Sequence, residues 1–147
     1  GGLRIHQANI DAFEGDFCSY AAGHINEAQM APSLRIDAET TVEKLSYDVV
    51  RRIGALAPFG RGNPAPVVAI RGCNVLTGPK RIGRNGQTVT MLLGQNSASI
   101  RAVGFGMGDL ADLLVGVREV DVAAEPCLNC FNGKTTAELK LQDVIWD

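Results

Sequence analysis

The apolar residues in the first part of the chain recur at the spacing of one helix face: Ile10, Phe13, Phe17 and Ala21. Asn9 stands directly before them and is a candidate N-cap residue, while Gly23 and His24 mark the end of the pattern. Residues 3–5 and residues 34–38 alternate as short strands do. The pattern therefore predicts one amphipathic helix between two short strands.

A second helix is predicted after Ser46, whose hydroxyl can cap its first turn. Pro58 would stop this helix, because proline disfavours helical geometry in the residue before it. Arg51 and Arg52 would lie on its outer side. Its predicted apolar stripe consists of Val49, Val50, Ile53, Leu56 and Ala57.

From Val67 onward the pattern changes to runs rich in β-branched residues that alternate with a period of two. The predicted strands are 67–76, 87–93, 97–105, 119–127 and 136–145. Turn residues separate them at 77–79, 84–86, 94–96 and 131–133, and residues 109–114 read as one short helix between the third and fourth strands. This layout predicts an α+β, mainly β fold, in which helices precede a five-stranded antiparallel barrel like the OB fold.

The charges along the chain are unevenly distributed although the net charge is only −2. Residues 49–108 contain eight basic residues and no acidic one, whereas the segments on either side are acidic. A surface that meets phosphates would explain this gap, because carboxylates there would repel the ligand. A glycine-rich β region whose few charges happen to be basic is the alternative reading.

Composition and cysteine usage favour a cytoplasmic protein. No apolar run approaches the roughly 18 residues of a membrane span, and residues 1–4 lack the features of a signal peptide. The chain lacks an initiator methionine and begins within an apparent strand, so we expect it to be a piece of something longer. The cysteines are expected to be reduced thiols: Cys18, Cys73, Cys127 and Cys130.

Cys127 and Cys130 form a lone C-x-x-C pair, and His6 and His24 lie far from it in sequence. A metal ribbon needs a second pair or nearby histidines, and on a strand these two thiols would point to opposite faces. We therefore predict no metal site in this chain. Buried or half-buried thiols are the expected role of the pair, with a redox role as the alternative.

One segment carries a long and specific motif. Residues 56–67 resemble the RecJ family of single-strand DNA exonucleases, in which a helix ends in P-F-G-x-G-N-x-x-P before an OB domain; Pro58 to Pro66 match it position by position. Physically, Gly60 and Gly62 allow a tight backbone path and Phe59 can pin the turn to the core.

Other segments resemble the same family in the same order. Residues 2–5 and 9–13 look like the last strand and helix of its DHH-associated domain, and residues 36–39 look like the lead-in to its OB domain. The resemblance thus implies a DHH-associated remnant at 1–32 and a RecJ-type OB domain at 33–147. Three departures stand out: Thr88-Val89-Thr90 replaces a His-Leu-Lys-like element, Phe131 replaces a frequent Trp, and the Gly-Gly-His motif has no match.

The resemblance implies a part in DNA repair and recombination as the single-stranded DNA-binding region of a 5′-3′ exonuclease. In such relatives, Mn or Mg ions held by Asp and His residues of an N-terminal DHH domain activate water for phosphodiester hydrolysis. No Asp-His-His cluster stands in this sequence, so the fragment by itself is expected to lack a catalytic residue, a cofactor and activity. It would guide single-stranded DNA to the absent nuclease domains.

The candidate DNA-binding residues are Arg61, Lys80, Arg81, Arg84, Arg101 and Phe131. The five bases would neutralise phosphates, and Phe131, in a turn, is the candidate for base stacking. Phe59, Phe105 and Trp146 are predicted to be core residues. Two alternatives stay open: a module that docks a repair partner such as a single-strand DNA-binding protein, or a structural brace of the same nuclease.

Overall fold

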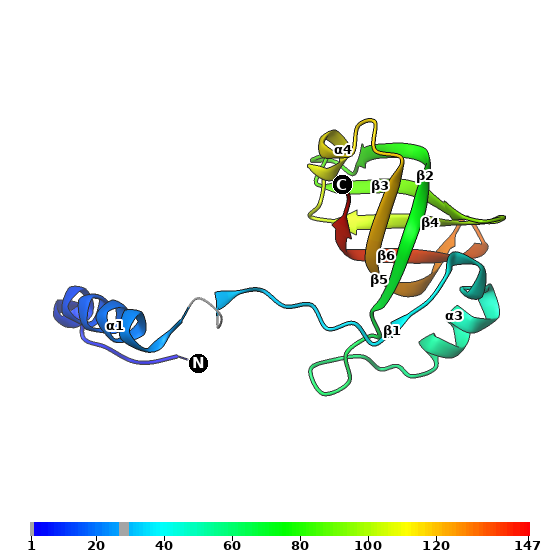
Figure 1. The fold of residues 1–147 in the computed structure, drawn as a ribbon. Helices are drawn as coiled ribbons and strands as arrows, with labels where there is room; N and C mark the ends of the chain where they lie inside the picture. The colour runs from blue at the N-terminus through cyan, green and yellow to red at the C-terminus, as the bar shows by residue number, and fades with distance from the viewer. Residues whose placement is uncertain (1, 27–29) are drawn as a thin grey trace. The chain divides into compact units, whose positions relative to one another are not determined.

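The β-rich part of the chain closes into a barrel in the computed structural model, which describes residues 2–26 and 30–147 (Figure 1). Its strands are β2 (Val68–Ile82), β3 (Thr88–Gln95), β4 (Ala98–Phe105), β5 (Glu119–Phe131) and β6 (Lys134–Ile145). They pair in the order β2-β3-β4-β6-β5, and β5 pairs back with β2. Only the β4–β6 pairing within this ring is parallel. The predicted five-stranded OB-fold-like barrel is confirmed.

The barrel interior is filled by side chains that alternate along the strands. On β3, Val89, Met91 and Leu93 are buried, and the residues between them face outward. Ile100 and Ala102 do the same on β4. This period of two follows from the pleat of the strand, so the residues that face outward are determined by those that fill the core.

Two strands are longer than predicted. β2 continues through Thr77-Gly78-Pro79, for which the sequence indicates a turn, and two register shifts against β3 flank these residues. Such bulges absorb a proline and a glycine without ending the strand. β5 likewise extends to Phe131, so that the β5–β6 turn consists of Asn132 and Gly133.

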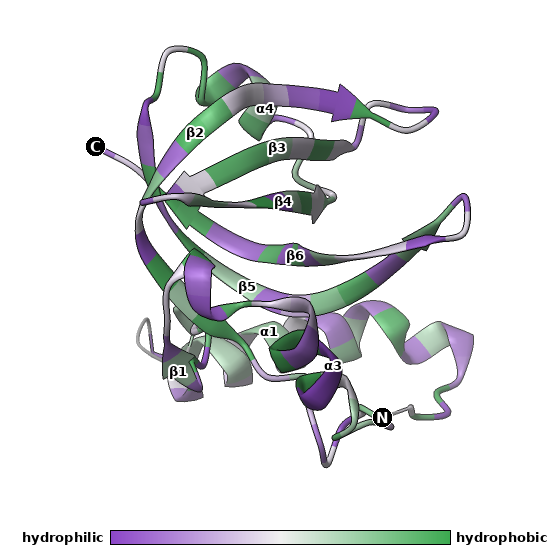
Figure 2. Cartoon of the chain, turned by 90° about the vertical axis from the view of Figure 1, so that its right-hand side faces the viewer, coloured by the Kyte–Doolittle hydropathy of each residue, from purple (hydrophilic) through white to green (hydrophobic). Residues whose placement is uncertain are grey.

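α3 (Tyr47–Gly54) packs against β5, beside which it lies in Figure 2. The predicted cap is confirmed, because the Val49 amide donates a hydrogen bond of 3.4 Å to the Ser46 hydroxyl. The helix is shorter than predicted, and Leu56 lies beyond its end and is exposed. Val50 is the one buried residue of α3, so a single side chain joins this helix to the barrel core.

The motif segment 56–67 forms a turn held by Asn63. The Asn63 side-chain amide donates to the carbonyls of Leu56 and Pro58 at 2.9 and 3.1 Å. Phe59 is 39% exposed, which corrects the prediction that it pins the turn to the core. The amide of Val67, which ends the segment, donates to the Asp37 carboxylate at 3.0 Å. Asp37 immediately precedes β1 (Ala38–Glu39), which pairs in parallel with β2.

The chain divides into two compact units, Gly1–Leu34 and Arg35–Asp147. In the first, α1 (Ile10–His24) begins where the apolar pattern begins and buries none of its residues. Asn9 makes no side-chain cap, which corrects that prediction; His6 instead caps the 3-10 turn η1 (Gln7–Asn9). Residues 3–5 form no strand, because no strand among the described residues pairs with them. The family assignment of this unit stays a prediction.

Candidate nucleic-acid interface

The outer faces of β3, β4, β6 and β5 form a continuous surface crossed by rows of paired residues. One row runs from Leu92 through Arg101 and Glu138 to Cys127, one residue from each strand. The neighbouring row runs from Thr90 through Val103 and Lys140 to Glu125. The barrel thus brings Arg101 from the acid-free central block next to acidic residues of the last two strands. We call this surface the Arg101 face.

Arg101 is held in place from two sides. Its Nε donates to the Thr90 hydroxyl at 3.1 Å, and its Nη1 lies 3.4 Å from Oε1 of Glu138. Glu138 is only 7% exposed, and the Asn129 side-chain amide donates to the same Oε1 at 3.0 Å. A buried carboxylate requires a cation and hydrogen-bond donors, and Arg101 and Asn129 supply them. Half of the Arg101 side chain remains exposed, so its guanidinium can still meet a ligand.

Three hollows meet at Arg101. One of about 390 Å³ is lined by Phe131, Lys134 and Asn129 together with Arg101. One of about 290 Å³ is lined by Phe105, Ile82, Val103, Leu139 and Lys140. One of about 190 Å³ is lined by Lys80, Thr77, Thr90 and Leu92. Arg101 lines each of them, so cations and apolar walls alternate along one surface.

Two exposed aromatic rings flank this surface. Phe131 is 71% exposed at the end of β5, and Phe105 is 64% exposed at the end of β4. The exposure of Phe105 corrects the prediction that it belongs to the core. Phe105 lies on the same strand face as Arg101, four residues away. This even spacing is the sequence signal that could have predicted the exposure of Phe105. Trp146 is half-buried and packs against the core.

Arg81 lies in a different environment at the end of β2. Its Nη2 contacts Asp112 at 2.6 Å and Asp109 at 3.0 Å, beside the short helix α4 (Leu110–Leu113). The hydrogen bond to Asp112, followed by that to Asp109, raises the pKa of Arg81 above its ordinary value. Its Nη1 also donates to the carbonyl of Gly86 at 3.3 Å. Arg81 thus ties the β2–β3 loop to α4.

A close backbone approach fixes the same loop. The Gly108 amide donates to the carbonyl of Gln87 at 3.0 Å, and a Cβ at Gly108 would collide with the carbonyl of Gly86. Only glycine fits this position without displacing the loop. Arg84 sits in the loop, exposed and without an ion pair in the described part of the chain.

The remaining predicted residues lie apart from one another. Lys80 lines the smallest of the three hollows and, within residues 2–26 and 30–147, makes no ion pair. Arg61 is exposed in the Gly60–Asn63 turn and is absent from the walls of these three hollows. The structure thus groups Lys80, Arg101 and Phe131 on one surface. Glu138, Asn129, Lys134 and Lys140, which the sequence reasoning missed, join them there.

The cysteines on β5 differ in their surroundings. Cys127 is half-buried on the Arg101 face, and burial, followed by the charges of Glu138 and Glu125, raises the pKa of its thiol despite the opposing charge of Lys140. Cys130 is exposed near the end of the strand. In the core, burial raises the pKa of the Cys73 thiol to about 11. The free thiols Cys127 and Cys73 are therefore protonated at neutral pH.

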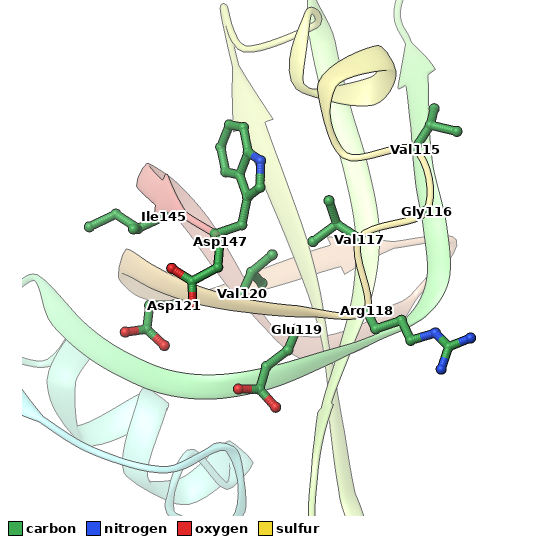
Figure 3. Close-up of a pocket in the computed structure, with 10 residues that line it drawn as sticks. Val115, Gly116, Val117, Arg118, Glu119, Val120, Asp121, Ile145 and Asp147 are labelled. Atoms are coloured by element: carbon green, nitrogen blue, oxygen red, sulfur yellow. The ribbon is translucent and has the colours of Figure 1, made fainter.

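A further hollow of about 540 Å³ lies on another part of the barrel and has acidic walls (Figure 3). The carboxylates of Glu119, Asp121 and Asp147 line it, whereas the Arg118 side chain points away from them in Figure 3. Its charge does not suit phosphates. In residues 2–26 and 30–147, no group of three His, Cys, Asp or Glu side chains could hold a metal ion. No helix of that same part is both long and apolar enough to cross a membrane.

Comparison with known proteins places these features in a family. A family profile described as the RecJ OB domain matches residues 36–143. The single-stranded-DNA-specific exonuclease RecJ of Bacillus subtilis (strain 168) is 24% identical over 142 residues, or 97% of this chain and 18% of that protein.

Two crystal structures of RecJ from Thermus thermophilus are similar over nearly all of the chain. The complex with Mn²⁺ has a TM-score of 0.74 at 25% identity, covering 99% of this chain and 20% of that one. The complex with Mg²⁺ has a TM-score of 0.71 at 26% identity, covering 97% and 21%. The chain therefore spans about a fifth of the length of these relatives. Because the matched residues cover the barrel and its lead-in, the chain belongs to the RecJ OB domain family.

Proposed function

We propose that this chain binds single-stranded DNA along the Arg101 face as part of a longer, RecJ-like exonuclease. The observation that carries the proposal is the meeting of three hollows at Arg101, with an exposed phenylalanine at two of them. Single strands bind where cations track the phosphates and aromatic rings receive the bases. The relative in Bacillus subtilis bears the name of a single-stranded-DNA-specific exonuclease, which supports this choice of ligand.

Each group on the face has a separate task in this proposal. Arg101, Lys80, Lys134 and Lys140 neutralise phosphates, while Phe105 and Phe131 stack on bases. Arg84 contacts phosphates from the β2–β3 loop, and Arg61 contacts them farther along the strand. Arg81 contributes less, because two carboxylates already neutralise it.

In the whole protein, the barrel would guide the strand to a separate nuclease domain for 5′-3′ digestion in DNA repair and recombination. That domain would hold the Mn or Mg ions that hydrolysis needs, since the described part of this chain offers no cluster of ligands for them. By itself the chain is expected to release no mononucleotides. Incubation with end-labelled single-stranded DNA and Mn²⁺ or Mg²⁺ tests this, and metal-dependent digestion by the purified chain would refute it.

Binding is tested by fluorescence anisotropy of the chain with a labelled single-stranded oligonucleotide across a salt series. We expect affinity in the micromolar range that falls as salt rises. Replacing Lys80 and Arg84 by Ala should reduce the slope of log affinity against log salt by about one for each phosphate that the variant no longer neutralises. The matched control replaces Arg52 of α3 and Arg118 by Ala, which removes the same charge from exposed positions outside the walls of the three hollows.

Each outcome of this experiment separates the proposal from its rivals. A reduced slope in the first variant and an unchanged slope in the control support DNA binding on the Arg101 face. Equal reductions in both variants would mean that only net charge matters. Absence of binding at low salt would overturn the proposal and leave partner docking or a structural brace as the role of the barrel.

A further inference from the structure

Glu138 is unusual because it places a buried carboxylate on the Arg101 face. It is the one buried polar or charged residue of the described part of the chain. Both of its hydrogen bonds, from Asn129 and from Arg101, end on Oε1. Among the residues that the structure describes, none donates a hydrogen bond to Oε2. A carboxylate can accept about four hydrogen bonds, so Glu138 retains capacity for a further donor.

Glu125 on the neighbouring row differs from Glu138 because each of its two carboxylate oxygens accepts a hydrogen bond. Its Oε2 accepts from Lys140 at 3.1 Å and its Oε1 accepts from Gln142 at 2.8 Å. Glu125 also lies outside the walls of the three hollows, whereas Glu138 lines two of them. The two carboxylates therefore have the same charge and lie on the same surface, but of the two only Glu138 has an oxygen that no donor of the described residues reaches.

The hollow beside Phe105 matches a nucleobase in size and chemistry. Its volume of about 290 Å³ is at the lower end of small-ligand sites, which suits one base rather than a larger molecule. Ile82 and Val103 supply apolar walls, and the exposed Phe105 ring supplies a stacking surface. Glu138 and Asn129 supply the polar groups that can distinguish one base edge from another.

We propose that this hollow selects bases that carry an exocyclic amino group, and that Glu138 is the residue that selects them. The proposal rests on the single-stranded DNA binding proposed above. Cytosine presents its N4 amino group as a donor, which the carboxylate accepts, whereas thymine presents the O4 acceptor at the same place. An acceptor facing an acceptor leaves both without a partner, so Glu138 attracts the first base and rejects the second.

The test compares the binding of two labelled oligonucleotides of equal length, oligo-dC and oligo-dT, by anisotropy. These two pyrimidine strands differ at the base edge more than in their stacking. We expect the wild-type chain to bind oligo-dC about threefold to tenfold more tightly, as one hydrogen bond to a charged group allows. In the E138Q variant, the amide can donate to O4 of thymine, so the preference should disappear or reverse.

Two further variants separate selection from a structural role. E125Q removes the same charge from the same surface, and it should change the affinity for both oligonucleotides by one common factor. F105L keeps the apolar wall but removes the ring, and it should weaken the binding of both and reduce the preference. A thermal unfolding curve of each variant establishes that the barrel is folded, so a loss of structure is not mistaken for a loss of selection.

The outcomes of this test are distinct. Salt-sensitive binding with equal affinity for both strands would overturn the selection by Glu138 and leave the proposed function standing. A preference that survives in E138Q would assign it to another residue and refute this inference. Failure of the wild-type chain to bind either strand would instead refute the proposed function itself.

Discussion

Arg101 and Arg81 come from the same acid-free block of the sequence, yet they lie in two opposite situations. Arg101 on β4 shares one buried carboxylate with Asn129 and borders three hollows. Arg81 on β2 is bound by two exposed carboxylates beside α4. Arg101 lines the three hollows, whereas Arg81 lines none of them and is paired with two carboxylates.

This difference shows that a cluster of basic residues in the sequence does not by itself produce a basic surface in the fold. Folding pairs Arg51, Arg71, Arg81 and Arg101 with acids that lie outside residues 49–108. An ion pair lowers the attraction of its cation for a phosphate, and it does so most where two carboxylates share one cation. What distinguishes Arg101 is that its partner is buried beneath it and its exposed half adjoins the hollows.

The largest effect is expected from Arg101→Ala. Removal of this cation should weaken the binding of single-stranded DNA by about tenfold, because a charge-assisted interaction disappears at the point where the hollows meet. Anisotropy measures the affinity, and Arg52→Ala on α3 is the control for net charge. An unchanged affinity would remove Arg101 from the interface.

A smaller effect in the opposite direction is expected when Arg81 is released. Replacing Asp109 and Asp112 by Asn frees the guanidinium and removes two negative charges, so the affinity for single-stranded DNA should rise about threefold at low salt. The gain should shrink as salt rises, because exposed charges are screened. The gain should also vanish when Arg81→Ala is added. A gain that persists without Arg81 would mean that only the acids matter.

Alkylation of Cys127 can measure occupancy of the Arg101 face without a substitution that changes the charge of that face. Because its thiol pKa is raised, the reactive thiolate forms at higher pH than in an ordinary thiol. Alkylation of Cys127 should therefore continue to accelerate at pH values above the pKa of an ordinary thiol. Bound oligonucleotide should slow this alkylation, whereas Cys18 on α1 should react at the same rate with or without DNA. Mass spectrometry after timed alkylation resolves the two sites. Equal protection of both would contradict a bound strand on this face.

The smallest effect on binding is expected from Arg81→Ala alone. Its two carboxylate partners leave little charge for DNA, so the affinity should change less than about twofold. The same change should loosen the β2–β3 loop from α4, which hydrogen exchange at residues 83–87 and 109–113 would detect. A large loss of affinity with unchanged exchange would place Arg81 in the interface and erase its contrast with Arg101.

The sequence predicted the barrel well because its signal is local. The alternation at 87–93 and 97–105 corresponds to β3 and β4 within one or two residues, and Ser46 caps α3 as its position indicates. Errors arose where a local signal was overruled by pairing, as at Thr77 to Pro79, which β2 absorbs through bulges. Phe105 was misplaced because apolar character was taken for burial, although its strand face is that of Arg101.

By itself, the sequence determined the succession of strands along the chain, the motif at 56–67, the family resemblance and the basic character of residues 49–108. Each of these depends on residues that lie close together in the chain. Only the tertiary structure decided that Arg71, Arg81 and Arg101 meet acids. The partners of Arg81 are 28 and 31 residues away and that of Arg101 is 37 residues away. Such pairs arise from the closure of the barrel, because strand register sets which distant side chains share a face.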